Sequence, residues 1–244
     1  MADTFKVLSL LLSYPTEDVV AGTAELKQVL EHEGMVPARL LPGLFRLIDD
    51  LGERDLFDLQ ERYVLLFDRT RSLSLHLFEH LHGESRARGQ AMVDLMQLYE
   101  QHGLLVEAKE LPDYLPLFLE FLSTLPVDEA GALLAEPVHI LSALRERHRK
   151  RKSAYTPVFR ALEALARGKA SAEATAALLA DPEDDPNDLQ ALDRVWEEEA
   201  VTFGPGAADA ACPAARDVLA RMDAPDHGAA VPGTATPPTA PSGG

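Results

Sequence analysis

The sequence predicts an all-α protein, a single globular multi-helix bundle with a disordered C-terminal tail. Apolar residues recur at helical spacing through most of the 244 residues, and no stretch alternates apolar and polar residues with β-branched enrichment. From about Gly204 onward the composition shifts to Ala, Pro, Gly and Thr, which offer too little apolar surface to offset the entropy of ordering. We therefore expect an all-helical domain over residues 1–203 and a largely disordered Ala/Pro/Gly-rich tail over residues 204–244.

Four groups of apolar residues define the clearest helices, because positions i, i+3, i+4 and i+7 share one helix face. These groups are Phe5, Leu8, Leu11 and Leu12; Leu56, Leu59, Tyr63 and Leu66; Met92, Leu95, Met96 and Tyr99; and Leu115, Phe118, Leu119 and Leu122. Thr156-Pro157 and Asp185-Pro186 each match an N-cap followed by proline at the first helical position. Glycine follows a periodic segment at positions 34, 52, 103 and 168, where a left-handed residue would end a helix. In chain order we predict helices over residues 3–13, 17–33, 38–51, 54–67, 73–82, 86–102, 113–125, 130–150, 157–167, 171–180 and 187–200.

The composition restricts the classes of partner. Forty acidic against 23 basic residues give a net charge of -17, which repels nucleic-acid phosphates and anionic membrane surfaces. No apolar run approaches the roughly 20 residues that span a bilayer, so we expect neither nucleic-acid binding nor membrane insertion. The acidity suits a basic peptide partner, but it also suits simple solubility. With a single cysteine, Cys212, and no export signal at the N-terminus, we expect a cytoplasmic protein without an internal disulfide.

The five residues from His76 to His80 match the H-x-x-E-H pattern of inverted zinc peptidases. On a helix, His76 and His80 would share a face and bind one metal ion, with Glu79 as a general base. That chemistry needs a third protein ligand, and a pattern this short is weakly specific. A zinc-dependent hydrolase is therefore an alternative interpretation, beside a general helical scaffold protein. No dinucleotide fingerprint, phosphate loop, nucleophile elbow or C-x-x-C motif supports catalysis elsewhere.

Two further segments call for interpretation. The run from Arg145 to Lys152 is the only basic block, and its place at a predicted helix end is explained by the helix dipole and by solvation. The segment from Glu110 to Phe118 contains two prolines and an aromatic residue at the start of a predicted helix. Pro112 and Asp113 would end the loop and cap that helix, and the same segment would present rigid apolar surface to a peptide.

Longer stretches carry a more specific resemblance. Leu66–Leu104 and Leu111–Ser123, together with the opening Phe5–Pro15, closely resemble the NarJ-type chaperones of respiratory nitrate reductase, which belong to the TorD-like group of redox-enzyme maturation proteins. The likeness covers roughly residues 3 to 200 and is strongest from 56 to 123. It implies a TorD-like helical bundle, no catalysis and no cofactor of its own. It also implies binding to the N-terminal segment of the nitrate reductase catalytic (alpha) subunit, and support of molybdenum cofactor insertion before membrane docking.

The leading hypothesis is therefore a client-specific assembly chaperone rather than an enzyme. An apolar groove would take the hydrophobic face of an amphipathic client helix, and acidic residues at its rim would meet the client's basic ones. A motif of the wider group corresponds here to Leu111, Pro112, Asp113 and Tyr114, with tyrosine where that group often has histidine. The candidate client-peptide-binding residues are Phe78, Tyr99, Glu110, Leu111, Pro112, Asp113, Tyr114 and Phe118. Whether the protein is a monomer or a dimer stays open.

Overall fold

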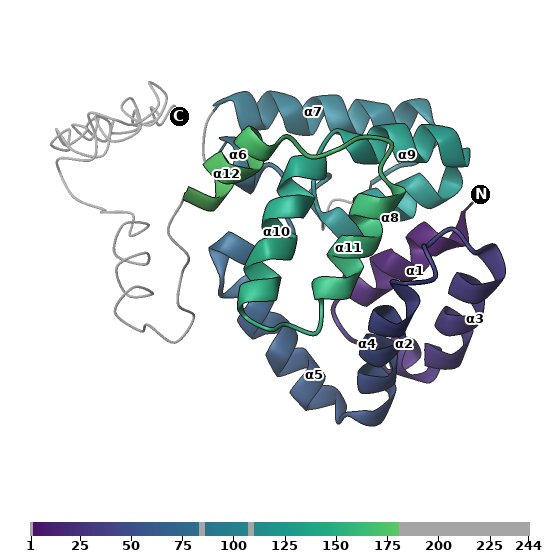
Figure 1. Ribbon diagram of the computed structural model, residues 1–244. Helices are drawn as coiled ribbons and strands as arrows, with labels where there is room; N and C mark the ends of the chain where they lie inside the picture. Colours follow the sequence, from purple (N-terminus) through teal and green to yellow (C-terminus); the bar gives the residue numbers. More distant parts are fainter. Residues whose placement is uncertain (1, 83–85, 107–109, 181–244) are drawn as a thin grey trace, which may run out of the picture. The chain divides into compact units, whose positions relative to one another are not determined.

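The computed structural model describes residues 2–82, 86–106 and 110–180, all within one compact unit. In these ranges all the regular elements are helices and there is no strand, while one isolated bridge joins His76 to Tyr114. The elements of Figure 1 are α1 (Asp3–Leu12), α2 (Glu17–Ala21), α3 (Thr23–Glu33), α4 (Leu41–Glu53), α5 (Leu56–Tyr63), the π-turn η1 (Val64–Asp68), the 3-10 turn η2 (Arg71–Leu73), α6 (Glu79–His82), α7 (Arg86–Gln101), α8 (Leu115–Thr124), α9 (Val127–Ala135), α10 (Val138–Lys150), α11 (Thr156–Leu165) and α12 (Ala172–Ala180). Within the described ranges, no helix is both long and apolar enough to cross a bilayer.

The first helix lies at the centre of the core. Phe5, Leu8 and Leu12 of α1 are fully buried, and α1 packs against α8, α3 and α11 (Figure 1). Burial of each such side chain contributes roughly 1.5–3 kcal/mol. The Ser9 hydroxyl donates to the carbonyl of Pro116 at 2.6 Å, so a polar residue on this apolar helix is satisfied by its neighbour α8. The helix predicted over residues 3–13 is confirmed.

A distant carboxylate caps the N-terminus of α1. Glu33, the last residue of α3, accepts hydrogen bonds from the backbone N–H groups of Asp3 and Thr4 at 2.8 and 2.7 Å, and from the Thr4 hydroxyl at 2.6 Å. Burial raises the pKa of Glu33, but the hydrogen bonds from Thr4 and Asp3 outweigh burial and lower the pKa below its ordinary value. A carboxylate at a helix N-terminus also meets the positive end of the helix dipole.

The second half of the described chain packs around α10. This helix contacts α11 and α12, and α11 in turn reaches α4 and α9. The buried guanidinium of Arg147 donates to the carbonyls of Ser72 and Leu178 at 2.8 and 2.6 Å, which ties η2 and α12 to α10. The ring of His148 stacks on Phe159 of α11 with centroids 4.9 Å apart. The basic end of α10 is thus held by its own buried residues.

Most predicted helices are confirmed, but three boundaries needed correction. The predicted helix over 17–33 divides at Gly22, and the one over 130–150 divides at Pro137, whose missing N–H interrupts helical hydrogen bonding. Gly34 and Gly103 adopt positive φ angles of 60° and 78°, as predicted for helix ends. Gly52 instead lies within α4, where an added Cβ would approach the Thr23 hydroxyl to 3.1 Å. The predicted helix over 187–200 and the tail from residue 204 lie outside the described residues.

The predicted helix over 73–82 is wrong. After η2 the chain is extended as far as His76 and turns at Leu77 and Phe78 into the short helix α6, which begins only at Glu79. Apolar residues at 73, 75, 77, 78 and 81 fit a helical and an extended pattern equally well. The hydrogen bonds that favour the extended over the helical conformation are made with Asp113 and Leu115, far along the chain.

Candidate functional site

The segment 74–78, extended as far as His76, lies antiparallel to the segment that enters α8. The N–H of Leu77 donates to the carbonyl of Asp113 at 3.1 Å, and the N–H of Leu115 donates to the carbonyl of Leu75 at 2.9 Å. These bonds flank the bridge between His76 and Tyr114. Leu75, Leu77 and Leu115 are buried, so the pairing brings two stretches of the predicted site together against the core.

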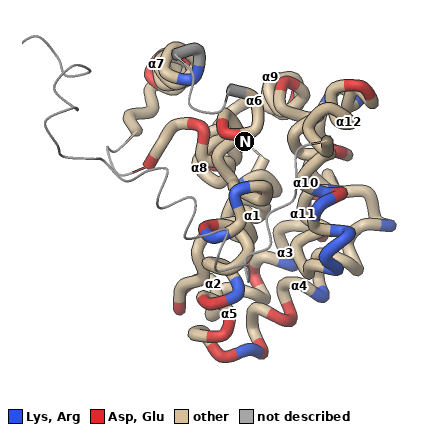
Figure 2. Tube along the Cα trace, turned by 90° about the vertical axis from the view of Figure 1, so that its left-hand side faces the viewer, with Lys and Arg blue, Asp and Glu red and all other residues tan. Residues whose placement is uncertain are grey.

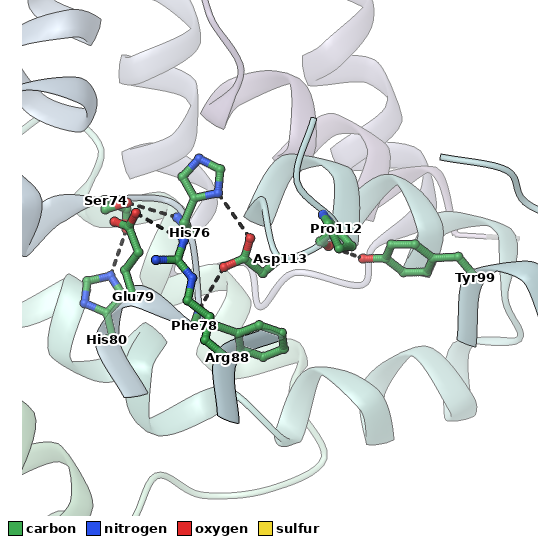
Figure 3. Close-up of polar contacts among 9 residues, drawn as sticks. All are labelled: Ser74, His76, Phe78, Glu79, His80, Arg88, Tyr99, Pro112 and Asp113. Atoms are coloured by element: carbon green, nitrogen blue, oxygen red, sulfur yellow. Dashed lines mark hydrogen bonds and ion pairs between the residues drawn. The ribbon is translucent and has the colours of Figure 1, made fainter. Parts of the chain in front are cut away.

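Asp113 holds this pairing from inside the protein. Its side chain is fully buried; Oδ2 accepts from the N–H of Phe78 at 3.0 Å, and Oδ1 lies 3.2 Å from Nδ1 of His76 (Figure 3). The hydrogen bond from His76 to Asp113 raises the pKa of the histidine, against the opposing effect of burial. A carboxylate that satisfies both oxygens in this way fixes the direction of the extended segment.

Tyrosine hydroxyls complete the polar contacts on either side. Tyr99 of α7 donates to the carbonyl of Pro112 at 2.7 Å (Figure 3). Tyr63 of α5 donates to the carbonyl of Leu12 at 3.0 Å, and its oxygen lies 2.8 Å from the hydroxyl of Tyr114. Because the single proton of Tyr63 is used on Leu12, Tyr114 donates to Tyr63. Pro112 and Tyr114, which precede α8, thus join this helix to α7 through Tyr99 and to α5 and α1 through Tyr63. We call Tyr63, His76, Tyr99, Asp113 and Tyr114 the buried polar network.

The geometry needed for a zinc peptidase is not formed by the H-x-x-E-H pattern. His76 is extended and bonded to Asp113, whereas His80 lies in α6, so the two rings do not share a helix face. Nε2 of His80 donates to the carbonyl of Ser74 at 2.9 Å, and burial lowers the pKa of this histidine. Glu79 lies 3.5 Å from Arg88 of α7 (Figure 3). Among residues 2–82, 86–106 and 110–180, no three potential ligands gather into a metal-binding cluster.

An open apolar pocket lies next to the buried polar network. Its volume is about 480 Å³. Its walls are α7, the segment that follows α7, and one face of α8; the lining residues are Tyr99, Leu104, Leu105, Val106, Glu110, Leu117, Glu120, Phe121 and Thr124. Gly103 ends α7 with positive φ, and the N–H of Leu104 donates back to the Tyr99 carbonyl at 3.0 Å. This turn directs Leu104–Val106 along the pocket, and Leu105 is 86% exposed.

The candidate binding residues divide into three groups by burial. Tyr99, Phe118 and Asp113 are buried, and Pro112 is buried beside them, so these residues shape the site from inside. Phe78 and Tyr114 are half-buried. Glu110 is exposed and Leu111 is 47% exposed, and these two alone among the eight are exposed. Of the eight, only Tyr99 and Glu110 line the pocket.

The sequence analysis did not identify most of the pocket wall. Leu117, Glu120, Phe121 and Thr124 follow the spacing i, i+3, i+4 and i+7 along α8, which is a signal readable from the sequence. Leu104, Leu105 and Val106 follow the helix-ending Gly103, and no periodic pattern marks them. Their role depends on where the turn directs them.

Comparisons with known proteins show the family of this chain. Residues 15–161 match the nitrate reductase delta subunit family, and the chain belongs to that family. It is 41% identical over 223 residues to the nitrate reductase molybdenum cofactor assembly chaperone NarJ of Escherichia coli strain K12, covering 91% of this chain and 94% of that protein. It is 42% identical over 198 residues to a probable chaperone of the same description, NarW, from the same strain, covering 81% and 82%.

A solved structure assigned to the redox enzyme maturation proteins, from Archaeoglobus fulgidus, is similar with a TM-score of 0.49 and 25% identity, covering 66% of this chain and 91% of that one. The relatives from Escherichia coli are named as chaperones and not as enzymes, in agreement with the expectation from the sequence.

Proposed function

We propose that this protein is an assembly chaperone for a respiratory nitrate reductase. It binds the N-terminal segment of the catalytic subunit in the cytoplasm and supports molybdenum cofactor insertion before that subunit docks at the membrane. The description of the relatives, which are 41% and 42% identical, supports the client class. The observation that carries the peptide-binding part is the open apolar pocket with glutamates at its edge.

The pocket has the shape and chemistry to receive one face of an amphipathic helix. Its floor is formed by apolar side chains of α7 and α8, and Leu105 stands exposed at its edge. A helix laid into such a groove buries residues at i, i+3, i+4 and i+7. The largest share of the binding free energy then comes from the apolar contacts at the centre of the groove.

Charge orients the client in the pocket. Glu110 and Glu120 are exposed at its edge, and none of the described residues that line it is Lys or Arg. Basic residues on the polar face of the client helix would therefore meet carboxylates at either side. Rim charges of this kind mainly raise the association rate and set the orientation. The net charge of -17 acts in the same direction at longer range.

Calorimetry with the full-length chain and a synthetic peptide of the client's N-terminal segment tests the proposal. We expect one-to-one binding to the unmodified protein. Leu105→Asp should weaken this binding at least about tenfold, because it places a charge where apolar client residues are buried. Val127→Ser is the matched control, since Val127 is a 46% exposed apolar residue of α9 outside the pocket.

A rival surface makes the test specific. Phe57 is 78% exposed and lines a second pocket with Tyr14 and Val64. If Phe57→Asp abolishes peptide binding while Leu105→Asp retains it, the groove assignment is wrong although the chaperone function stands. Absence of binding to the unmodified chain at low salt contradicts the peptide-binding function itself.

A further inference from the structure

The basic block at the end of α10 takes part in a second, chemically distinct pocket. Arg149 and Lys152 lie in the wall of a cavity of about 420 Å³ between α4, α5, the turn after α10 and the start of α11. The charged residues that line it are Arg46, Arg54, Arg62, Arg149, Lys152, Arg160 and a single acid, Asp50. Figure 2 shows blue segments gathered where the end of α10 and the start of α11 approach α4. Six cations and one carboxylate therefore share one recess in a chain of net charge -17.

The cations in this basic pocket are only partly neutralised. Asp50 accepts from Arg54 at 2.7 Å and from Arg62 at 2.5 Å, so one carboxylate serves two guanidinium groups. Burial raises the pKa of Asp50, but hydrogen bonds from Arg62 and Arg54 overcome that effect and lower it. The charge of one cation is left over even within this cluster.

Of the other four cations in the basic pocket, only one forms an ion pair within the part of the chain that the structure describes. Arg149 pairs with Glu146 at 2.7 Å. The side chains of Arg46, Lys152 and Arg160 make no hydrogen bond or ion pair with the part of the chain that the structure describes. All three are exposed, and they come from α4, the turn after α10, and α11. Three separate elements thus direct positive charge that no hydrogen bond or close ion pair engages into the same recess, although the carboxylate of Glu146 acts on Arg160 from a distance.

The backbone at this place is unusual as well. Lys152 has a φ angle of 53°, the only positive value outside glycine in the described ranges. The turn is held by hydrogen bonds from the N–H of Lys152 to the carbonyl of Arg149 at 3.1 Å and from the N–H of Ser153 to the carbonyl of His148 at 2.9 Å. A left-handed conformation costs free energy for a lysine, so it persists only where surrounding contacts enforce it. Here those contacts bring Lys152 back toward Arg149 at the pocket wall.

We propose that the basic pocket binds a compact polyphosphate group, either free or as part of a nucleotide. Guanidinium groups converging from several elements match the oxygen atoms of phosphates, which accept paired, charge-assisted hydrogen bonds. The volume lies within the range of roughly 300–1,000 Å³ typical of small-molecule sites. An extended nucleic acid is disfavoured, because the chain as a whole carries a net charge of -17. This site is separate from the apolar pocket, and none of its lining residues is shared with it.

Calorimetry of the full-length chain with sodium tripolyphosphate, at constant ionic strength, tests the proposal. We expect one-to-one binding, and a loss of at least about tenfold in affinity for Arg46→Gln and for Arg160→Gln. The control is Lys169→Gln, an exposed lysine beyond the opposite end of α11, which should bind like the unmodified chain. Circular dichroism and the thermal midpoint without ligand establish that each variant is folded. Because both arginines are exposed, folding should be retained.

Two further ligands identify the source of the phosphate. Adenosine triphosphate that binds more tightly than tripolyphosphate and responds to the same variants indicates a nucleotide, and equal affinities indicate a free polyphosphate. Absence of tripolyphosphate binding overturns the proposal, as does binding that ignores Arg46→Gln and Arg160→Gln. Tighter, variant-sensitive binding of a single-stranded oligonucleotide replaces it with a nucleic-acid site. Client-peptide binding should be unchanged in these variants, so the two proposals fail independently.

Discussion

The contact between His76 and Asp113 makes the stability of the fold depend on pH. Since the carboxylate favours the protonated ring, the pKa of His76 is raised in the folded protein. A raised pKa contributes stability that is fully present below the unfolded value, about 6.5, and is lost as the pH rises through the folded value. We expect the free energy of unfolding of the unmodified chain to decline more from pH 6 to 8 than that of His76→Gln. Urea denaturation at intervals of half a pH unit measures both slopes.

The opposite shift at His80 does not obscure this comparison. Burial lowers the pKa of His80, so its contribution to stability increases as the pH rises toward the unfolded value. Because His80 is present in both proteins, its effect cancels in the difference. His32→Gln, at an exposed histidine of α3, is the control and should leave the slope unchanged. Parallel slopes for His76→Gln and the unmodified chain would show that the contact does not bias protonation.

At the scale of single elements, α1 depends on a cap that lies outside its own sequence. Glu33 satisfies two of the backbone N–H groups that begin α1, and an amide would keep only part of that interaction. We expect Glu33→Gln to lower the free energy of unfolding by about 1 kcal/mol near neutral pH, the usual value of a helix cap. Chemical denaturation monitored by circular dichroism measures the change. Glu31→Gln, two residues earlier and exposed, should have an effect close to zero.

The carboxylate of Glu33 also gives the direction of the pH effect. Its pKa is lowered in the folded protein, so its contribution is present above the unfolded value and is lost as the pH falls through the folded value. The difference between Glu33→Gln and the unmodified chain should therefore shrink on acidification. A difference that grows in acid would contradict the assignment of Glu33 as an ionised cap.

The elements also show where sequence reasoning succeeds. Helices with long apolar repeats, such as α1, α7 and α8, lie within two residues of their predicted ends. Their signal is local, because one face of each helix must be buried. Residues 74–78 were assigned wrongly because their partners are residues 113–115, and no pattern within the segment records that pairing. The same limit applies to the candidate site, since the sequence offers Asp113 as a client-peptide-binding residue whereas its side chain is fully buried.

At the scale of the whole molecule, net charge and the apolar pocket should affect different steps of client binding. Raising the salt concentration screens the attraction between the acidic chain and a basic peptide. We expect the association rate to fall by about tenfold between roughly 0.05 and 0.5 M salt, while the dissociation rate changes much less. Stopped-flow fluorescence with a labelled client peptide separates the two rates.

Variants of the pocket rim provide the comparison. The double variant Glu110→Gln with Glu120→Gln should show a smaller dependence of the association rate on salt, because two charges nearest the peptide are removed. Gln substitutions at Glu17 and Glu53, two exposed glutamates outside that pocket, remove the same net charge elsewhere. Equal effects of the two double variants would mean that overall charge, and not the rim, steers the peptide.

The packing of α1 against α8 has a consequence for biosynthesis. The hydrogen bond from Ser9 to Pro116 spans 107 residues, and the apolar face of α1 is buried largely by α8. A ribosome therefore exposes Phe5, Leu8 and Leu12 long before their partner has emerged. The apolar face of α1 therefore stays uncovered until α8, which ends at Thr124 of 244 residues, has been translated, which is about half of the synthesis. A protein that shields the unfinished segment of another would thus pass through the same vulnerable stage itself.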